Sequence, residues 1–373
     1  MLNNILQAVA LQKPHMKKIF FKSRLFIYVG LCLVLFSRMT QAAVYTLTGN
    51  DTIIGEIDTV LSGFDDTLLD IGKNYGFGLQ EIKLANPGID TWRPGEGRKI
   101  VLPSEFILPN APKAGIILNI PEMRLYYFPE KKPGEGQQVI TYPLGVGREG
   151  WATPYMKTRI IQKKEHPNWY PPESIRKEHE DNGDPLPKIV PPGPDNPMGD
   201  YALKLASGDS DGAYSIHGTN KAFGVGMRVS HGCIRLYAED IADLFHRVKI
   251  NTPVNIINQP YKVGERNGVI YLEVHPHLDE DHEHFSQNSI TEVVKYIIEV
   301  TDENRYRIDW DLVRKVVEES SGMPVAIGMN ITEKQSVADT VLNQEQVQSA
   351  TGTSATTDSN NRVNSRLDTE IGH

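Results

Sequence analysis

The stretch Ser230-His231-Gly232-Cys233-Ile234-Arg235 decides how the rest of this chain is interpreted. Sixteen positions before Cys233 lies His217, within Ser215-Ile216-His217-Gly218-Thr219. A cysteine reacts as its thiolate, and a free thiol with a pKa of ~8.5 is only slightly ionised near neutral pH. A histidine nearby takes the thiol proton, and the imidazolium that forms stabilises the thiolate. The pattern therefore indicates a cysteine nucleophile with a histidine base.

Three simpler interpretations apply to the same residues. A single cysteine and a single histidine are more often core or surface residues than catalysts. The apolar residues after Cys233 are compatible with simple core packing. His217, His231 and Cys233 are also candidate zinc ligands, because His231 and Cys233 share one face of an extended segment.

The joint spacing of these residues resembles the signature of the L,D-transpeptidase catalytic domain, the YkuD-type fold. That signature is a strand ending in His-Gly-Thr, then Ser/Thr-His-Gly-Cys, an apolar residue and Asn or Arg, and every part is present here. Residues 113–258 also contain Asn119-Ile120-Pro121-Glu122, which marks a hairpin, and Pro143-Leu144-Gly145-Val146-Gly147-Arg148, which is similar to the family. The resemblance implies an α+β domain that is rich in β-strands.

The resemblance also assigns roles to the residues of the motif. Cys233 is the expected nucleophile, and His217 is the expected general base and later the acid for the leaving amine. The main-chain carbonyl of Gly218 is expected to orient the imidazole. Arg235 is a candidate partner for a substrate carboxylate, with a structural ion pair as the alternative. No cofactor or metal is needed. The turn of the nucleophile, where backbone N–H groups can receive an oxyanion, is shaped by Ser230, His231 and Gly232.

By the same resemblance, the reaction is acyl transfer on the stem peptides of peptidoglycan. Cys233 attacks the carbonyl between the third residue and the terminal D-alanine of a tetrapeptide stem, and D-alanine leaves. The thioester then passes to an amine, which is either the diaminopimelate of another stem, giving a 3→3 cross-link, or a lysine of an envelope lipoprotein. The order of segments in the chain favours lipoprotein anchoring. Two other classes stay open: a thiol hydrolase of stem peptides and a non-catalytic protein that binds the wall.

Length and composition limit the remaining possibilities. The 373 residues are enough for two or three domains, and 39% apolar residues can form substantial cores. A formal net charge of -8 argues against nucleic acid as a partner.

Residues 1–43 are typical of a secretory signal, which predicts a periplasmic enzyme. The apolar run 25–36 is shorter than the ~20 residues of a membrane-spanning helix, and an uncleaved anchor is the alternative. Met16 is a candidate start. Removal of the signal takes Cys32 and leaves Cys233 as the one cysteine of the exported chain, so no intramolecular disulfide can form. The positive segment before the apolar run consists of Lys17, Lys18, Lys22 and Arg24.

Residues 44–104 are expected to form a small unit in the order strand, helix, helix, strand. Asp66 is the expected N-cap of the first helix, and Gly76 ends it. This order, with Asn86-Pro87-Gly88 after the second helix, resembles a LysM module, a type that binds N-acetylglucosamine-containing glycans such as peptidoglycan. Asp65-Asp66 stands where Gly-Asp is usual, and a packing domain without a ligand is the alternative. We expect removal of the unit to weaken wall binding and to leave activity on short soluble stems.

Four further segments complete the chain. Residues 105–112 are expected to be a linker punctuated by proline. The proline-rich residues 165–200 predict an ordered flap beside the active site, with residues 169–176 neither helical nor in a central strand. Residues 262–330 predict a small α/β appendage, in which Asp309 caps a helix. Residues 331–373 contain few large apolar side chains, which predicts disorder. Candidate metal ligands, with a solvated loop as the alternative, are His275, His277, His282 and His284.

Overall fold

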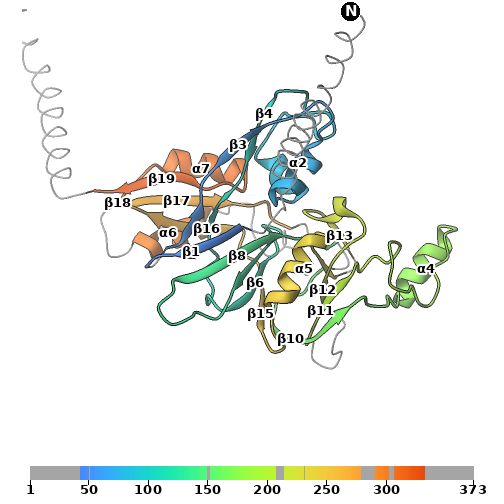
Figure 1. Cartoon of the computed structure of the whole chain (residues 1–373). Helices are drawn as coiled ribbons and strands as arrows, with labels where there is room; N and C mark the ends of the chain where they lie inside the picture. The colour runs from blue at the N-terminus through green and yellow to red at the C-terminus, as the bar shows by residue number, and fades with distance from the viewer. Residues whose placement is uncertain are drawn as a thin grey trace, which may run out of the picture.

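The structure is a computed structural model of the chain, and it describes residues 43–49, 51–148, 152–206, 214–230, 232–278, 290–301 and 306–331. The predicted signal and tail fall outside these residues, apart from Ala43 and Ile331, as do His231, His282 and His284. A central sheet, an N-terminal unit and a C-terminal sheet pack together (Figure 1). Within the described ranges, no helix combines the length and apolar character needed to cross a membrane.

The central unit is built on a nine-stranded mixed sheet. Its antiparallel pairs include the hairpins β6–β7 and β7–β8 and the sequence-distant pairs β1–β8 and β10–β15, whereas β15 lies parallel to β6 and β14 lies parallel to β12. Helix α5 (Ala238–Arg247) packs against it and buries Ile241, Leu244 and Phe245. The strands, in their order across the sheet, are β1 (Ala43–Leu47), β8 (Gln137–Pro143), β7 (Arg124–Phe128), β6 (Gly115–Asn119), β15 (Pro253–Ile257), β10 (Met156–Glu165), β11 (Tyr201–Leu205), β12 (Ser215–His217) and β14 (Ile234–Arg235).

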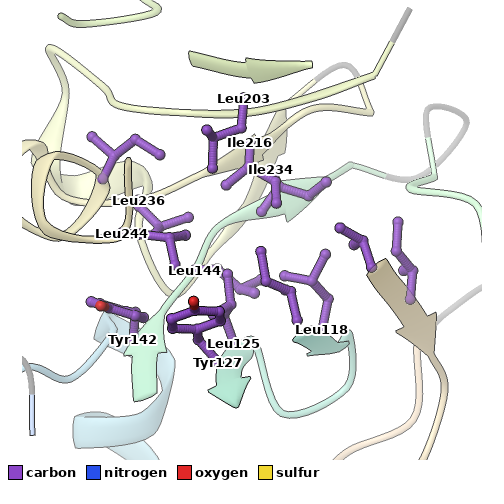
Figure 2. Packing of buried hydrophobic residues seen from close by; sticks show 14 of the residues in the cluster. Leu118, Leu125, Tyr127, Tyr142, Leu144, Leu203, Ile216, Ile234, Leu236 and Leu244 are labelled. Atoms are coloured by element: carbon purple, nitrogen blue, oxygen red, sulfur yellow. The ribbon is translucent and has the colours of Figure 1, made fainter. Parts of the chain in front are cut away.

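Both faces of the central sheet are covered, which explains why every residue of β6 and β7 is buried. Successive side chains of a strand point to opposite faces. Leu118 and Leu125 therefore join the core under α5, where Figure 2 shows them with Ile216, Ile234 and Leu244. The alternate residues of the same strands belong to a second core, which is shared with the N-terminal unit: Ile117, Tyr126 and Phe128.

The N-terminal unit has the expected order of strand, helix, helix and strand: β3 (Asp58–Leu61), α2 (Leu68–Tyr75), α3 (Leu79–Leu84) and β4 (Lys99–Leu102), with β3 and β4 paired. Gly76 ends α2 in the left-handed region, as predicted. The prediction that Asp66 is the N-cap of α2 is wrong. Thr67 caps the helix in a capping box with Asp70, because its hydroxyl is three residues from a carboxylate, while Asp66 accepts from the amide of Gly63.

The prediction that residues 105–112 form a linker is wrong in part, because these residues contain a strand. Strand β5 (Glu105–Ile107) pairs with β2 (Ile53–Gly55), and Phe106, Ile107 and Leu108 are buried. Three apolar residues next to prolines were too short a signal for a strand. Their burial instead comes from contacts with strands that are distant in the sequence.

The C-terminal unit is a four-stranded antiparallel sheet with two helices and its own apolar core. Asp309 caps α7, as predicted, and accepts from the amide of Leu312. A buried lysine ties this unit to the rest, since Lys262 contacts Glu122 of the β6–β7 turn at 2.8 Å and Glu273 at 2.6 Å. The elements are β16 (Tyr261–Arg266), β17 (Val269–Val274), α6 (Ile290–Thr301), β18 (Tyr306–Ile308), α7 (Trp310–Glu319) and β19 (Val325–Asn330).

The proline-rich flap is ordered and includes a helix that the sequence analysis excluded. Helix α4 (Glu173–Asp181) starts directly after Pro172, which serves as its N-cap. Proline is compatible with a helix start, because the first amide groups have no partner inside the helix. Paired backbone hydrogen bonds of 2.9 Å between Trp169 and Val190 close the base of the flap.

Candidate active site

Two short parallel strands bring the motif residues together. In β12 and β14, Ile216 faces Ile234 and His217 faces Arg235, and Cys233 directly precedes β14. Because side chains alternate along a strand, Ile216 enters the core while Ser215 and His217 point to the opposite side. The two-residue period of an extended strand is enough to produce this alternation.

A broad pocket lies over these residues and is open to solvent. It is lined by four residues of the two strands and the motif: Ser215, His217, Cys233 and Arg235. The flap lines it through Trp169, Tyr170, Ile175 and His179. Other lining residues include Lys164, Lys204, Lys221, Phe223 and Val229. The flap therefore lies beside the motif, as the sequence analysis expected.

His217 is buried, with 4% of its surface exposed. Its Nδ1 lies 2.6 Å from the carbonyl oxygen of Gly218, which can only accept, so Nδ1 carries the proton and Nε2 is left as the basic atom. Burial, followed by the nearby Arg235 charge, lowers the pKa of His217 to about 4. The imidazole is therefore neutral at neutral pH and able to accept a proton.

The thiol of Cys233 is mostly buried, and burial raises its pKa. Three contacts oppose that shift: the Ser215 hydroxyl, whose oxygen is 4.0 Å from Sγ, the Ser215 backbone, and the Arg235 charge. The thiol and the imidazole of this pocket are thus both neutral at neutral pH. Arg235 favours negative charge on sulfur and opposes positive charge on the imidazole.

The turn before the nucleophile is held by hydroxyl groups. The Ser230 hydroxyl donates to the carbonyl oxygen of Cys233 at 2.6 Å, and the Thr153 hydroxyl donates to that of Gly232 at 3.2 Å. Gly232 has a φ of 88°, a left-handed conformation that costs glycine little. The predicted supporting residues Ser230 and Gly232 therefore meet at this turn, and His231 lies outside the described residues.

The Arg235 guanidinium lines the pocket, and no carboxylate pairs with it among the residues that the structure describes. Its Nε is buried and has no hydrogen-bond partner within the described part of the chain. Its backbone is fixed by paired hydrogen bonds with Gly145, at 2.8 and 2.9 Å. A guanidinium on the pocket wall with an unused donor is suited to a carboxylate.

Sequence reasoning gave no role to Ser215 or Thr153. Ser215 was detectable, since it lies two positions before His217 on the same strand and so on the same face. Thr153 had no signal, because it lies 79 positions from Gly232 and only the fold brings them together.

The candidate metal ligands near the C-terminal sheet have other partners. His275 contacts the Glu273 carboxylate at 2.6 Å, and His277 contacts Tyr261. The Glu122 and Glu273 carboxylates lie near His275, but the Lys262 ammonium between them already supplies the opposing charge. These contacts favour a structural role for the cluster.

Comparisons with known proteins show the family of the chain. A family model described as the L,D-transpeptidase catalytic domain, YkuD, matches residues 113–256. The chain is 41% identical to the probable L,D-transpeptidase YcfS of Escherichia coli (strain K12), over 69% of this chain and 79% of that protein. It is 36% identical to the probable L,D-transpeptidase YbiS of the same strain, over 81% of this chain and 96% of that protein. It is 37% identical to the probable L,D-transpeptidase ErfK/SrfK of Salmonella typhimurium (strain LT2), over 79% of this chain and 94% of that protein.

The resemblance seen in the motif is thus confirmed over most of the chain and not only around Cys233. The β-rich central domain with its helices is the fold of that catalytic domain. The chain belongs to the L,D-transpeptidase family, and it is an enzyme of that class.

Proposed function

We propose that this enzyme is exported to the periplasm and uses Cys233 to transfer a peptidoglycan stem peptide through a thioester. The observation that carries the proposal is the shared pocket of a partly buried thiol and a neutral imidazole whose Nδ1 is fixed by the Gly218 carbonyl. The family match supports peptidoglycan stem peptides as the substrate class.

The acylation step follows from the protonation states of the two residues. The Cys233 thiol gives its proton to Nε2 of His217, and sulfur forms a bond to the carbonyl carbon before the terminal D-alanine. The oxyanion faces the backbone N–H groups of the turn at Gly232. The C–N bond then breaks, His217 returns the proton to the leaving nitrogen, and D-alanine departs from the thioester.

The second step resolves the thioester with an amine. His217 is neutral again, so it can take a proton from the attacking amine, and the thiolate then leaves and is reprotonated. Arg235 stabilises the thiolate in both steps, because its charge lowers the pKa of Cys233. Its unused Nε donor supports a second role, the binding of a stem carboxylate.

We further propose that the amine belongs to a lysine of an envelope lipoprotein, with 3→3 cross-linking as the second candidate. The proposal rests on the order of segments, a signal followed by a LysM-like unit and the catalytic domain. Both acceptors offer a primary amine, so the chemistry of the site does not separate them. An exposed flap with Tyr170 at the pocket gives a flexible terminus room to enter.

The acceptor is tested by expressing the protein in a strain that lacks its own L,D-transpeptidases and digesting the isolated wall. We expect muropeptides that carry a lipoprotein remnant on the third stem residue. Digests that contain 3→3 dimers and no lipoprotein remnant would show that the acceptor is the diaminopimelate of another stem. Tripeptide stems without either product would instead indicate a thiol hydrolase.

We also propose that the N-terminal unit binds wall glycan as a LysM module does. Two large aromatic side chains project from neighbouring loops: Phe64, which is 78% exposed, and Trp92, which is 64% exposed. A hydrogen bond of 2.8 Å from the Leu68 amide to the Thr91 carbonyl joins these loops. Exposed rings on a rigid support are suited to packing on sugar faces.

Replacing both rings, Phe64→Ala with Trp92→Ala, should weaken binding to insoluble peptidoglycan by about tenfold or more, because two large contact surfaces are lost. Sedimentation of the purified protein with wall fragments measures this change. Tyr75→Ala is the matched control, since Tyr75 is an exposed ring of the same unit on helix α2. Equal sedimentation of the double variant and the control would count against glycan binding at these loops.

A further inference from the structure

The loop that leads into the nucleophile has the N-terminal unit directly behind it. We call residues 221–230 the wall strip. It comprises the short helix η1 (Ala222–Gly224), residues 225–227 and β13 (Arg228–Ser230). One side of the strip lines the catalytic pocket, through Lys221, Phe223 and Val229. Its last residue, Ser230, donates to the carbonyl of Cys233, so a displacement of the strip reaches the nucleophile's turn.

The other side of the wall strip caps a helix of the N-terminal unit. The amide of Leu79 donates to the carbonyl of Val225 at 3.2 Å, and the amide of Gln80 donates to that of Gly226 at 3.1 Å. These are first-turn amides of α3, which have no partner inside the helix. The strip supplies the missing acceptors, and α3 in turn satisfies two carbonyls of the strip.

The two backbones touch at a pair of glycines. A β-carbon placed on Gly78 would lie 2.6 Å from the α-carbon of Gly226, and one on Gly226 would lie 2.3 Å from the amide nitrogen of Leu79. Neither neighbour is a flexible side chain that could turn away. The distance between α3 and the wall strip is therefore fixed at backbone contact.

A buried ion pair fixes α3 to the central sheet. The Glu81 carboxylate accepts from Nε of Arg124 at 2.7 Å and from the amide of Gly78, also at 2.7 Å. Arg124, on β7, also donates to the carbonyl of Gly76 at 3.0 Å. Both side chains are largely removed from solvent, with 1% of Arg124 and 9% of Glu81 exposed. Helix α3 is thus bound to the central sheet through Arg124 on one side, and it contacts the wall strip on its other side.

We propose that the N-terminal unit is a positioning part of the active site, which acts on Cys233 through the wall strip. Gly78, Glu81 and Gly226 are positioning residues in this proposal, and none of them lines the catalytic pocket. The proposal rests on the proposed role of Cys233. It replaces the expectation that the unit can be removed without effect on short soluble stems, because removal would leave Val225 and Gly226 without their partners.

The test is Gly78→Ala in the full chain, assayed by D-alanine release from a short soluble tetrapeptide that does not need glycan binding. The added methyl group must separate α3 from the strip, and small displacements at a reacting group cost up to about a hundredfold in rate. We expect kcat to fall about tenfold or more with little change in KM. Dividing the rate by the amplitude of the first-turnover burst gives kcat per working site and removes any loss of folded protein.

Gly88→Ala is the matched control. Gly88 lies in the same unit with a φ of 79°, and a β-carbon there meets nothing within 4 Å, so the change strains the unit without touching the strip. We expect its kcat per working site to stay at the wild-type value. A milder second variant is Tyr237→Phe, which adds no atom. It removes one hydrogen bond between the catalytic domain and the N-terminal unit, from the Tyr237 hydroxyl to the carbonyl of Phe77 at 3.1 Å.

Three outcomes decide the question. A lower kcat per working site in Gly78→Ala, and a smaller loss of the same kind in Tyr237→Phe, supports positioning. A loss confined to the burst amplitude, with unchanged kcat per working site, overturns it and leaves a folding contact only. The role of Cys233 is tested separately, by the Cys233→Ala variant. If that variant kept releasing D-alanine, Cys233 would not be the nucleophile. The Gly78→Ala comparison would still be valid, because it measures product release and does not depend on which residue is the nucleophile.

Discussion

Cys233→Ala is expected to lower D-alanine release from tetrapeptide stems by about 10⁴-fold or more, since removal of a covalent nucleophile leaves only binding and oxyanion stabilisation. The fold should tolerate the change, because the thiol lines the pocket and is not part of the central core. The rate of D-alanine release by the purified variant measures the effect, and circular dichroism checks the fold.

A control separates loss of the nucleophile from loss of shape. Ser215→Ala removes the hydroxyl that is 4.0 Å from the thiol and leaves Sγ in place, so it should lose far less activity than Cys233→Ala. Substantial turnover by Cys233→Ala would contradict the assignment of Cys233 as the nucleophile.

His217→Ala has the second largest expected effect, about 10²- to 10⁴-fold in kcat/KM, the usual contribution of a positioned acid–base group. The pH dependence identifies the cause. Burial lowers the pKa of His217 to about 4, so the wild-type imidazole stays neutral and active above that pH. Activity should therefore fall only as the pH drops through about 4, and not near the ordinary histidine value of about 6.5.

In His217→Ala this acid limb should disappear, and the residual rate should rise with pH as Cys233 ionises without help. Rates of D-alanine release between acidic and alkaline pH, together with thiol alkylation rates, measure both effects. An acid limb that persists in the variant would assign the titration to another group.

Local patterns were enough to predict much of this site. The two-residue period of β12 places Ser215 and His217 opposite Ile216, and the structure has that alternation. Glycine at 76 ended α2 because few other residues adopt a left-handed cap easily. These features depend on one or two neighbouring residues, so they can be read from the sequence.

Contacts between distant segments were not predictable in the same way. Strand β1 pairs with β8 across 90 to 98 positions, from Leu47 with Gln137 to Ala43 with Thr141, and no periodicity of either segment selects that partner. The capping of α3 by Val225 and Gly226 is likewise invisible in the sequence, since any residue can supply a carbonyl. The prolines Pro171-Pro172 argue against a helix when they are read as part of it, whereas in the structure Pro172 occupies the position directly before α4, which proline fits.

The central claim, a thioester on Cys233, is tested most directly by mass spectrometry of the purified enzyme mixed with a tetrapeptide donor and quenched without acceptor. We expect the intact protein to gain the mass of the stem minus D-alanine, and digestion to place the adduct on the peptide that contains Cys233. The adduct should vanish on addition of an amine acceptor and be absent from Cys233→Ala. D-alanine release with no adduct on that peptide, or an adduct that Cys233→Ala retains, would contradict the mechanism.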